Sequence, residues 1–165
     1  MATAEGTELA RTIRTKMEEL VKICDGLNEE IASRAPANRW SPKQIVSHIS
    51  GQDGIGYMPA FDLILKQDTP RIDIIAEDPF FTERRSKLTM KELVAEAGKE
   101  YAKIADLVLT ISADQLNRKA HIPLFKDTAL GEYPTLAMFV GGLGSWHLEF
   151  HISHMKEILK DLGAT

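Results

Sequence analysis

Hydrophobic residues recur every three or four positions in four stretches of the chain, the spacing that gathers them on one face of an α-helix. These stretches span residues 7–25, 41–66, 89–111 and 135–162. The hydrophobic faces of the first and third consist of Leu9, Ile13, Leu20, Ile23 and Leu27, and of Leu93, Ala97, Ile104, Leu107 and Ile111. A further short turn of helix is expected over residues 28–33. The pattern predicts four long helices.

Two of these helices begin at clear start signals. Ser41-Pro42-Lys43-Gln44 and Thr89-Met90-Lys91-Glu92 each place a hydroxyl residue three positions before Gln or Glu, the pattern of a capping box. Pro42 would occupy the first helical position, where proline is well tolerated. Pro59 lies inside the second predicted helix, and it should kink that helix or end its first part.

Two long polar connections separate the helices. Residues 68–87 follow the second helix and residues 112–133 follow the third. Connections of that length suggest a crossover or a functional lid rather than a tight turn. No stretch shows the strict alternation that is typical of a half-buried β-strand. The sequence thus predicts an all-α protein, a single four-helix-bundle domain over residues 1–165 with long connections after helices two and three.

The charge balance argues against one broad class of function. Twenty Lys and Arg residues against 24 Asp and Glu residues leave a net charge of −4, whereas nucleic-acid binding needs a clustered positive surface. The basic pair Arg84-Arg85 follows Glu83 and is interpreted as part of a solvated loop. The longest apolar stretch, residues 136–146, is far shorter than the ~20 residues that span a bilayer. Neither nucleic acid nor a membrane is an expected partner.

Cysteine use and the N-terminal residues indicate a cytoplasmic protein. Cys24 is the only cysteine, so no disulfide can form within the chain, which suits a reducing compartment. The first residues lack the basic-then-apolar order of a secretory signal. Cys24 lies near the apolar face of the first helix and is expected to be a small buried hydrophobic residue.

The fourth helix carries the strongest candidate for chemistry, a group of three histidines. At about 100° per residue, His147, His151 and His154 fall on one face. His147 and His151 are about 6 Å apart along the axis and can converge on one metal ion, whereas His147 and His154 are about 10.5 Å apart and cannot. A third ligand would then come from another helix, and His48 is the best candidate. The alternative is that all of these are core histidines bonded to backbone carbonyls.

These residues also carry a resemblance to a known family. The segments Trp40-Ser41-x-x-Gln44-x-x-x-His48 and Trp146-His147-x-x-x-His151-x-x-His154 together resemble the DinB/YfiT-like superfamily. The resemblance implies a four-helix bundle with three metal-binding histidines, which match His48, His147 and His151 position by position. It spans the whole chain in helix order, but its specific residues are confined to the two histidine segments.

The resemblance also implies a class of function. Members of the superfamily include metal-dependent transferases that act on low-molecular-weight thiols, and a maleylpyruvate isomerase that uses such a thiol. Three neutral imidazoles leave a divalent metal at least one open position, where a bound thiol loses its proton. The expected function is therefore a metal-dependent transferase or isomerase that joins a small thiol to an electrophilic small molecule.

Zinc or nickel is the expected metal, although three histidines also suit iron or copper. A homodimer is the expected assembly. Two other functions stay open at this point: a non-catalytic metal-binding stress-response protein, and a dimerising helical module whose histidines belong to the core.

Several neighbouring residues suggest supporting roles. Leu136, Val140 and Gly144 fall on or beside the histidine face of the fourth helix. Leu136 and Val140 are expected to form an apolar wall above the metal together with Ile55, and Gly144 would leave room beside His147. Gly144 equally suits a close approach of two helices. Glu100 lies inside the apolar stripe of the third helix, where it should accept a hydrogen bond from a ligating histidine or pair with a Lys or Arg.

The remaining histidine and the aromatic residues are given simpler interpretations. His121 is expected to be an ordinary loop residue that could approach the mouth of the site. Trp40, Trp146 and Phe150 are interpreted as packing residues, and Tyr57 and Tyr133 as residues that could line a substrate entrance.

Overall fold

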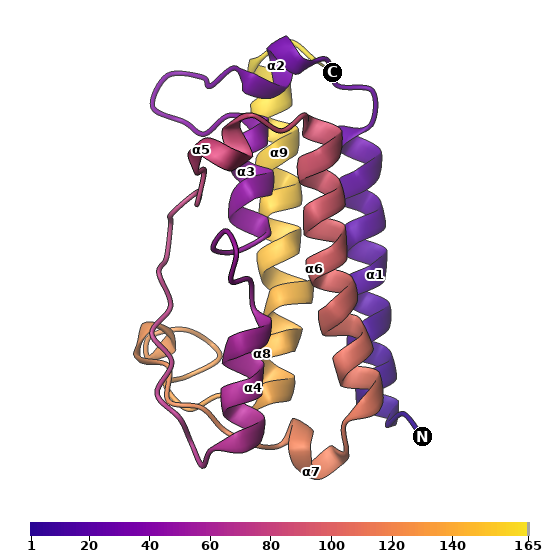
Figure 1. Cartoon of the computed structure of the whole chain (residues 1–165), viewed down its shortest axis with the longest axis vertical. Coiled ribbons are helices and arrows are strands. Elements are labelled where there is room, and N and C mark those ends of the chain that lie inside the picture. Colours follow the sequence, from indigo (N-terminus) through magenta and orange to yellow (C-terminus); the bar gives the residue numbers. More distant parts are fainter. Residues whose placement is uncertain (165) are drawn as a thin grey trace.

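Four helical columns run side by side in the computed structural model, which describes residues 1–164 (Figure 1). Two columns are single long helices, α1 (Ala4–Cys24) and α6 (Met90–Thr110). The third consists of α3 (Pro42–Ile49) and α4 (Met58–Lys66) stacked end to end, and the fourth of α8 (Leu136–Gly142), η2 (Leu143–Leu148) and α9 (Glu149–Asp161). Residues 1–164 contain no β-strand, so the all-α prediction is confirmed.

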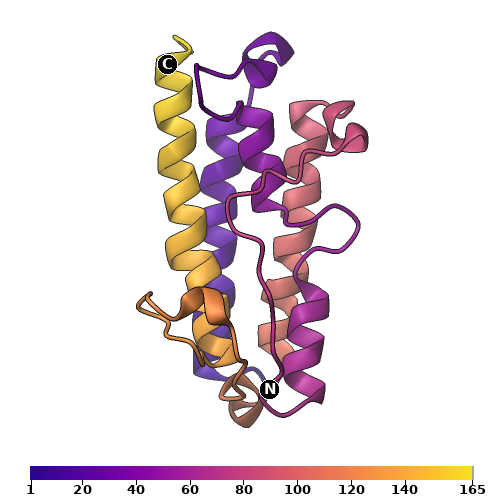
Figure 2. The same ribbon diagram turned by 90° about the vertical axis from the view of Figure 1, so that its left-hand side faces the viewer.

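Both predicted long connections are present, and each carries short helical turns. These turns are α5 (Glu83–Ser86) in the first connection, and α7 (Ala113–Leu116) and η1 (Pro123–Phe125) in the second; α2 (Glu29–Ser33) follows α1. The first connection climbs along the bundle from the end of α4 to α5 (Figure 2). Main-chain hydrogen bonds of 2.9 Å join it to the second connection, from Ile72 N to the His121 carbonyl and from His121 N to the Pro70 carbonyl.

Both predicted capping boxes are formed at the starts of their helices. Gln44 N donates to Ser41 Oγ at 3.2 Å, and Ser41 N donates to Gln44 Oε1 at 2.8 Å. Thr89 and Glu92 form the same reciprocal pair at the start of α6. The first helix begins earlier than predicted, because Thr3 provides its cap by accepting a hydrogen bond from the third residue of α1. Capping depends on residues within one turn, which is why the sequence alone locates it.

The second predicted helix is in fact two helices, because the chain leaves the helical path after α3 and re-enters it at α4. The break precedes Pro59, which occupies the second position of α4, where a missing N–H costs little. Gly51 and Gly56 have φ angles of +74° and +66°, a region that favours glycine. A Cβ atom at Gly56 would also overlap the Glu100 carboxylate. The prediction that Pro59 would kink the helix over residues 41–66 or end its first part is therefore correct in that the helix is interrupted, but the interruption lies before Pro59, between Ile49 and Met58.

The last column contains a wide π-helical turn, η2, between two α-helical segments. Gly144 lies within this turn and faces α1, where an added Cβ would meet Ile13 Cγ1 at 3.1 Å. A π-turn holds more residues than an α-turn, so the residues before it are rotated away from the positions that a regular helix would give them. The prediction of a helix over residues 135–162 has nearly the right ends, but the helix is not a regular α-helix, because the π-turn interrupts it.

A buried arginine ties the first connection to the end of α3. Arg85 is only 4% exposed, and its Nη1 donates to the Gly51 carbonyl at 2.6 Å and to the Ser47 carbonyl at 2.9 Å. Its neighbour Arg84 remains at the surface, paired with Asp53 at 2.6 Å. The interpretation of the basic pair as a solvated loop is therefore wrong for Arg85, because the turn at Gly51 presents carbonyl groups that replace its water.

The interior of the bundle is one continuous hydrophobic cluster. Its largest fully buried side chains are Tyr101, Phe61, Ile13, Leu20, Ile45, Ile49, Ile64, Leu93, Ile104, Leu116, Ile122 and Leu136. Cys24 is buried in this cluster, as expected, and burial raises the pKa of its thiol to about 12. A thiol with that pKa stays protonated at neutral pH, which makes it a poor nucleophile.

Among the described helices, none is both long and apolar enough to cross a membrane.

Candidate metal centre

Three elements bring His48, His147 and His151 together. His48 lies in the last turn of α3, His147 in the π-turn η2 and His151 in the first turn of α9. One ring nitrogen of each lies within 4.8 Å of the other two. His48 Nε2 and His147 Nε2 are 3.0 Å apart, close to the separation of roughly 3 Å expected for two nitrogens that share a metal. Within residues 1–164 this is the single group of three or more His, Cys, Asp or Glu side chains with such spacing.

Each of these histidines has a different partner for its second ring nitrogen. His48 Nδ1 lies 2.6 Å from the Asp78 carbonyl oxygen and can only donate to it. His147 Nδ1 lies 3.5 Å from the Tyr101 hydroxyl, and His151 Nδ1 lies 3.4 Å from a nitrogen of His154. Metal-binding histidines are commonly held through the nitrogen that does not bind the metal. The lone pair of His48 therefore lies on Nε2, which faces His147, and in the other two rings it is Nδ1 that is engaged by a neighbour outside the cluster.

Burial keeps these imidazoles neutral. Desolvation lowers the pKa of His48, and it lowers the pKa of His147 to about 4. The pKa of His151 falls to about 2, first through desolvation and then through the neighbouring histidines. A neutral imidazole carries the lone pair that binds a metal, so the three rings are in the ligand-competent form at neutral pH.

The low pKa values predict that the metal-free protein loses stability in mild acid. The unfolded chain takes up protons below about pH 6.5, whereas folded His147 stays neutral until about pH 4. Stability is therefore full above pH 6.5 and falls as the pH decreases, by about 2 kcal/mol at pH 5 for His147 alone. Urea unfolding of metal-free protein at several values between pH 7.5 and 5 would measure this. A His147→Gln variant should show a shallower dependence, and an equal slope would contradict the assignment.

Aromatic rings surround the cluster. The His48 ring lies 5.0 Å from the Trp40 ring and 6.2 Å from the Phe80 ring, measured between centroids. Trp146 and Phe150 stack on each other at 5.8 Å on the outer side of the last column. These two rings are 68% and 54% exposed, so the interpretation of both as packing residues is wrong. Trp146 and Phe150 directly precede His147 and His151 in the sequence. Neighbouring residues of a helix point in directions about 100° apart, so when the two histidines face the inside of the bundle the two aromatic rings face outward.

Leu136, Val140 and Ile55 do not form the apolar wall that was predicted above the histidine cluster. Val140 and Gly144 line a small depression with Leu9 of α1, on the α1 side of the last column, and Leu136 is fully buried in the core. Ile55 is 51% exposed in the loop between α3 and α4. The π-turn explains the error, because the helical wheel assumed one regular helix through it. Gly144 thus serves the close approach of two helices.

Glu100 and His121 stabilise loops and do not reach the cluster. Glu100 Oε1 accepts a hydrogen bond from Tyr57 N at 2.7 Å, and Oε2 lies 3.4 Å from Lys103 Nζ. The salt-bridge alternative for Glu100 is therefore correct, and the hydrogen bond to a ligating histidine is not formed. His121 Nε2 lies 2.9 Å from Glu132 Oε1, and its ring stacks on Tyr133 at 4.8 Å.

The two tyrosines that could line an entrance have other contacts. The Tyr57 hydroxyl donates to the Ile49 carbonyl at 3.0 Å, and burial raises the pKa of Tyr57 to about 12. Tyr133 is 51% exposed and covers His121 rather than the cluster. The sequence offered no signal that Tyr101 and Asp78 would support the histidines, because both partners come from distant parts of the chain.

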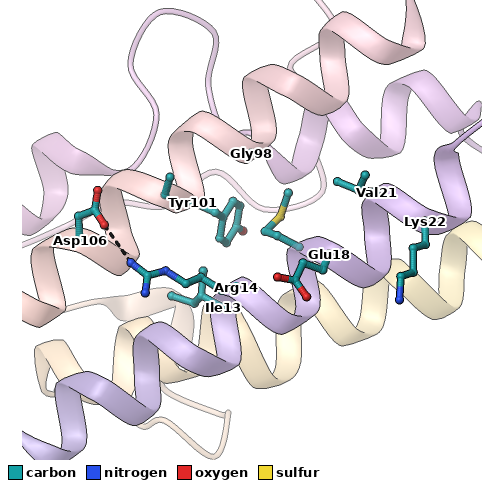
Figure 3. A pocket seen from close by; sticks show the side chains of 10 residues that line it. Ile13, Arg14, Glu18, Val21, Lys22, Gly98, Tyr101 and Asp106 are labelled. Carbon is teal, nitrogen blue, oxygen red and sulfur yellow. Dashed lines mark hydrogen bonds and ion pairs between the residues drawn. The ribbon is translucent and has the colours of Figure 1, made fainter.

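A groove lies away from the histidine cluster, between α1 and α6. It measures about 510 Å³, and its floor includes Ile13, Met17 and Tyr101. Arg14 and Asp106 bridge its rim with an ion pair of 3.1 Å (Figure 3). The Tyr101 ring separates this groove from the histidine cluster, since its hydroxyl faces His147.

The donor set fits a divalent transition metal. Three neutral nitrogens suit zinc, nickel, iron or copper, whereas magnesium and calcium prefer oxygen ligands. No carboxylate belongs to the cluster in the described part of the chain, so a metal held there would keep its full double charge. Three protein ligands also leave at least one position open, as in catalytic rather than structural zinc sites.

Comparison with protein-family models gives no match, and neither does comparison with curated proteins. Comparison with solved structures gives YfiT from Bacillus subtilis, described as a probable metal-dependent hydrolase with an unusual four-helix bundle topology. The TM-score is 0.79 at 19% sequence identity, and the match covers 100% of this chain and 92% of that chain. At this level of identity the likeness concerns the fold. The chain therefore shares the four-helix-bundle fold of YfiT.

Proposed function

We propose that the protein is a metal-dependent enzyme that transfers a small thiol to an electrophile, with His48, His147 and His151 as the metal ligands. The observation that carries the proposal is the convergence of three neutral ring nitrogens, with no fourth His, Cys, Asp or Glu ligand beside them among residues 1–164. Zinc or nickel is the proposed metal. A metal held there would act as a Lewis acid and lower the pKa of a thiol that binds beside it.

The residues of the chain would orient the reactants and exclude water. His48 is fixed by the Asp78 carbonyl and His147 by the Tyr101 hydroxyl, so neither ring needs to reorganise during a reaction. Trp40 and Phe80 pack against the His48 ring and shield it from solvent. A site with fixed ligands and few waters strengthens the electrostatic effect of the metal on a bound thiol.

The chemistry of the cluster favours a thiol over water as the nucleophile. Glu100, the carboxylate that the sequence had suggested near the histidines, is committed to Tyr57 N and Lys103. Activation of water is commonly assisted by such a general base. A thiol with a pKa near 8.5 needs less assistance than water with a pKa near 15.7. The site is therefore better suited to thiol transfer.

Trp146 and Phe150 offer the electrophile an apolar surface. Their stacked rings are exposed, and the Phe150 ring lies 5.0 Å from the His151 ring. Of the two rings Phe150 is the one beside the cluster, so a hydrophobic electrophile that approaches the metal could bury its flat part against Phe150. This surface takes the place of the wall that was predicted from Leu136 and Val140.

The test is a panel of thiols with one chromogenic electrophile. Glutathione, cysteine and coenzyme A would each be combined with an aromatic halide, in the presence of metal-loaded protein. Faster product formation than with free metal in buffer supports the proposal. If no thiol is accelerated while the protein still binds one metal per chain, the non-catalytic metal-binding protein becomes the better account.

Hydrolysis is the second candidate, because YfiT is described as a probable metal-dependent hydrolase. The same metal-loaded sample should be tested with chromogenic esters and amides in the absence of thiol. Release of product that does not depend on thiol would favour hydrolysis.

Assembly as a homodimer and location in the cytoplasm stay predictions, which light scattering and cell fractionation can test.

The metal-free protein is expected to keep its helices. The core of the described chain involves all four columns and does not depend on the three histidines, unlike the core of a small zinc finger. Chelation should leave the helical circular dichroism signal nearly unchanged and lower the melting temperature, because a metal that binds only the folded state stabilises it. Complete loss of the helical signal after chelation would contradict this expectation.

A further inference from the structure

His154 stands next to the cluster without belonging to it. It follows His151 by three positions on α9, and the two Nδ1 atoms are 3.4 Å apart. The sequence placed His154 on the histidine face but too far from His147 to share a metal. It is half-buried, between the cluster and the surface.

The contact between two Nδ1 atoms allows one hydrogen bond with two possible directions. If His154 donates, then neutral His151 carries its own proton on Nε2, and that nitrogen cannot bind a metal. If His151 donates, its Nε2 has a free lone pair directed away from His154. Only the second direction is compatible with His151 as a ligand beside His48 and His147.

Aromatic rings hold His154 in place for this contact. The centroid of its ring lies 6.2 Å from that of Trp40 and 6.2 Å from that of Phe150. Trp40 also stacks on the His151 ring at 6.4 Å with an angle of 14° between the planes. The two histidines therefore share one aromatic wall, which limits the rotation of either ring.

We propose that His154 is a positioning residue: its Nδ1 accepts the Nδ1–H of His151 and so holds His151 in the tautomer and orientation that present Nε2 to the metal. This inference rests on the proposed metal site. Carboxylates and carbonyls are the more common partners of ligating histidines. A neutral imidazole can accept the same hydrogen bond. Unlike a carboxylate, it adds no negative charge near the metal, so the metal remains a stronger Lewis acid.

Cobalt(II) titration of four proteins tests the effect on metal affinity. The proteins are the wild type, His154→Ala, His154→Gln and the control Ser153→Ala, whose side chain is exposed. His154→Ala should weaken cobalt binding roughly 10- to 100-fold, still reach one ion per chain at high cobalt, and shift the visible absorption bands. His154→Gln should recover most of the affinity, because its amide oxygen can accept the same proton. Equal affinity and equal spectra for His154→Ala and Ser153→Ala would overturn the proposal.

A second measurement separates this inference from the proposed function. In metal-free protein at pH 7.5, long-range ¹H–¹⁵N NMR reports which ring nitrogen of His151 carries the proton. The wild type and His154→Gln should show the Nδ1–H form, and His154→Ala should show a mixture. A wild type in the Nε2–H form would contradict the role of His154. A wild type that shows Nδ1–H but binds no cobalt would instead contradict the metal site alone.

Discussion

A double variant, His147→Ala with His151→Ala, is expected to lose the metal completely, from about one ion per chain to near zero. The two rings supply two of the three nitrogens that lie within 4.8 Å of one another. His48 alone would remain, and a single imidazole does not hold a divalent ion against buffer and solvent. Elemental analysis of protein purified without an affinity tag measures the ratio directly.

His121→Ala is the matched control for this experiment. It removes a histidine that is bonded to Glu132 in the second long connection, away from the cluster. The control should keep the wild-type metal ratio. Circular dichroism of the double variant should still show a helical bundle, because loss of metal through unfolding would say nothing about the ligands. A folded double variant that keeps the wild-type ratio would exclude these residues as ligands.

A His48→Ala variant is expected to lose thiol transfer, with product formation falling to the rate of free metal in buffer. His48 is the one ligand that comes from outside the last column, so its loss removes the link between α3 and that column. The loss of metal affinity should exceed the roughly 100-fold that removal of a supporting residue can cause. The transfer assay with the active thiol of the panel measures the effect.

Metal reconstitution provides the control for this variant. Wild-type protein that has been stripped by a chelator should be inactive and should regain activity when metal is restored. His48→Ala should not regain activity at the same metal concentration. A Gln52→Ala variant, which changes an exposed side chain just beyond α3, should behave like the wild type. Full transfer activity in stripped wild type would exclude the metal from the reaction.

Features that depend on one or two helical turns could be predicted from the sequence. The capping boxes at Ser41 and Thr89 depend on contacts three residues apart, and the structure forms both. The grouping of His147 with His151 depends on one turn of helix and survives the change in helix type. His48 could be added because it lies on the inward side of a second helix, whose start the cap at Ser41 locates, and because no Asp or Glu of the predicted helices matches that position so well.

Features that depend on distant residues could not be predicted. The break between α3 and α4 accommodates Glu100 of another column against Gly56, although the three closely spaced glycines of residues 51–56 were a local hint. Burial of Arg85 depends on carbonyl groups of α3 and of the loop after it. The partners of His48 and His147 are a main-chain carbonyl and a tyrosine hydroxyl far away in the sequence.

The π-turn gives this segment a tolerance for the loss of one residue. It spreads the rotation of an α-helical turn over one more residue, so deleting one residue between Gly141 and Ser145 would let a regular α-helix form while α8 kept its orientation relative to α9. Leu136 and Val140, both fully buried, would then stay in the core, and His147 and His151 would keep their spacing. An insertion or a second deletion would instead turn α8 by about 100° relative to α9. Among chains of this fold, a gap of one residue within this turn should therefore be compatible with the histidine site, whereas other changes of length should fall in the long connections.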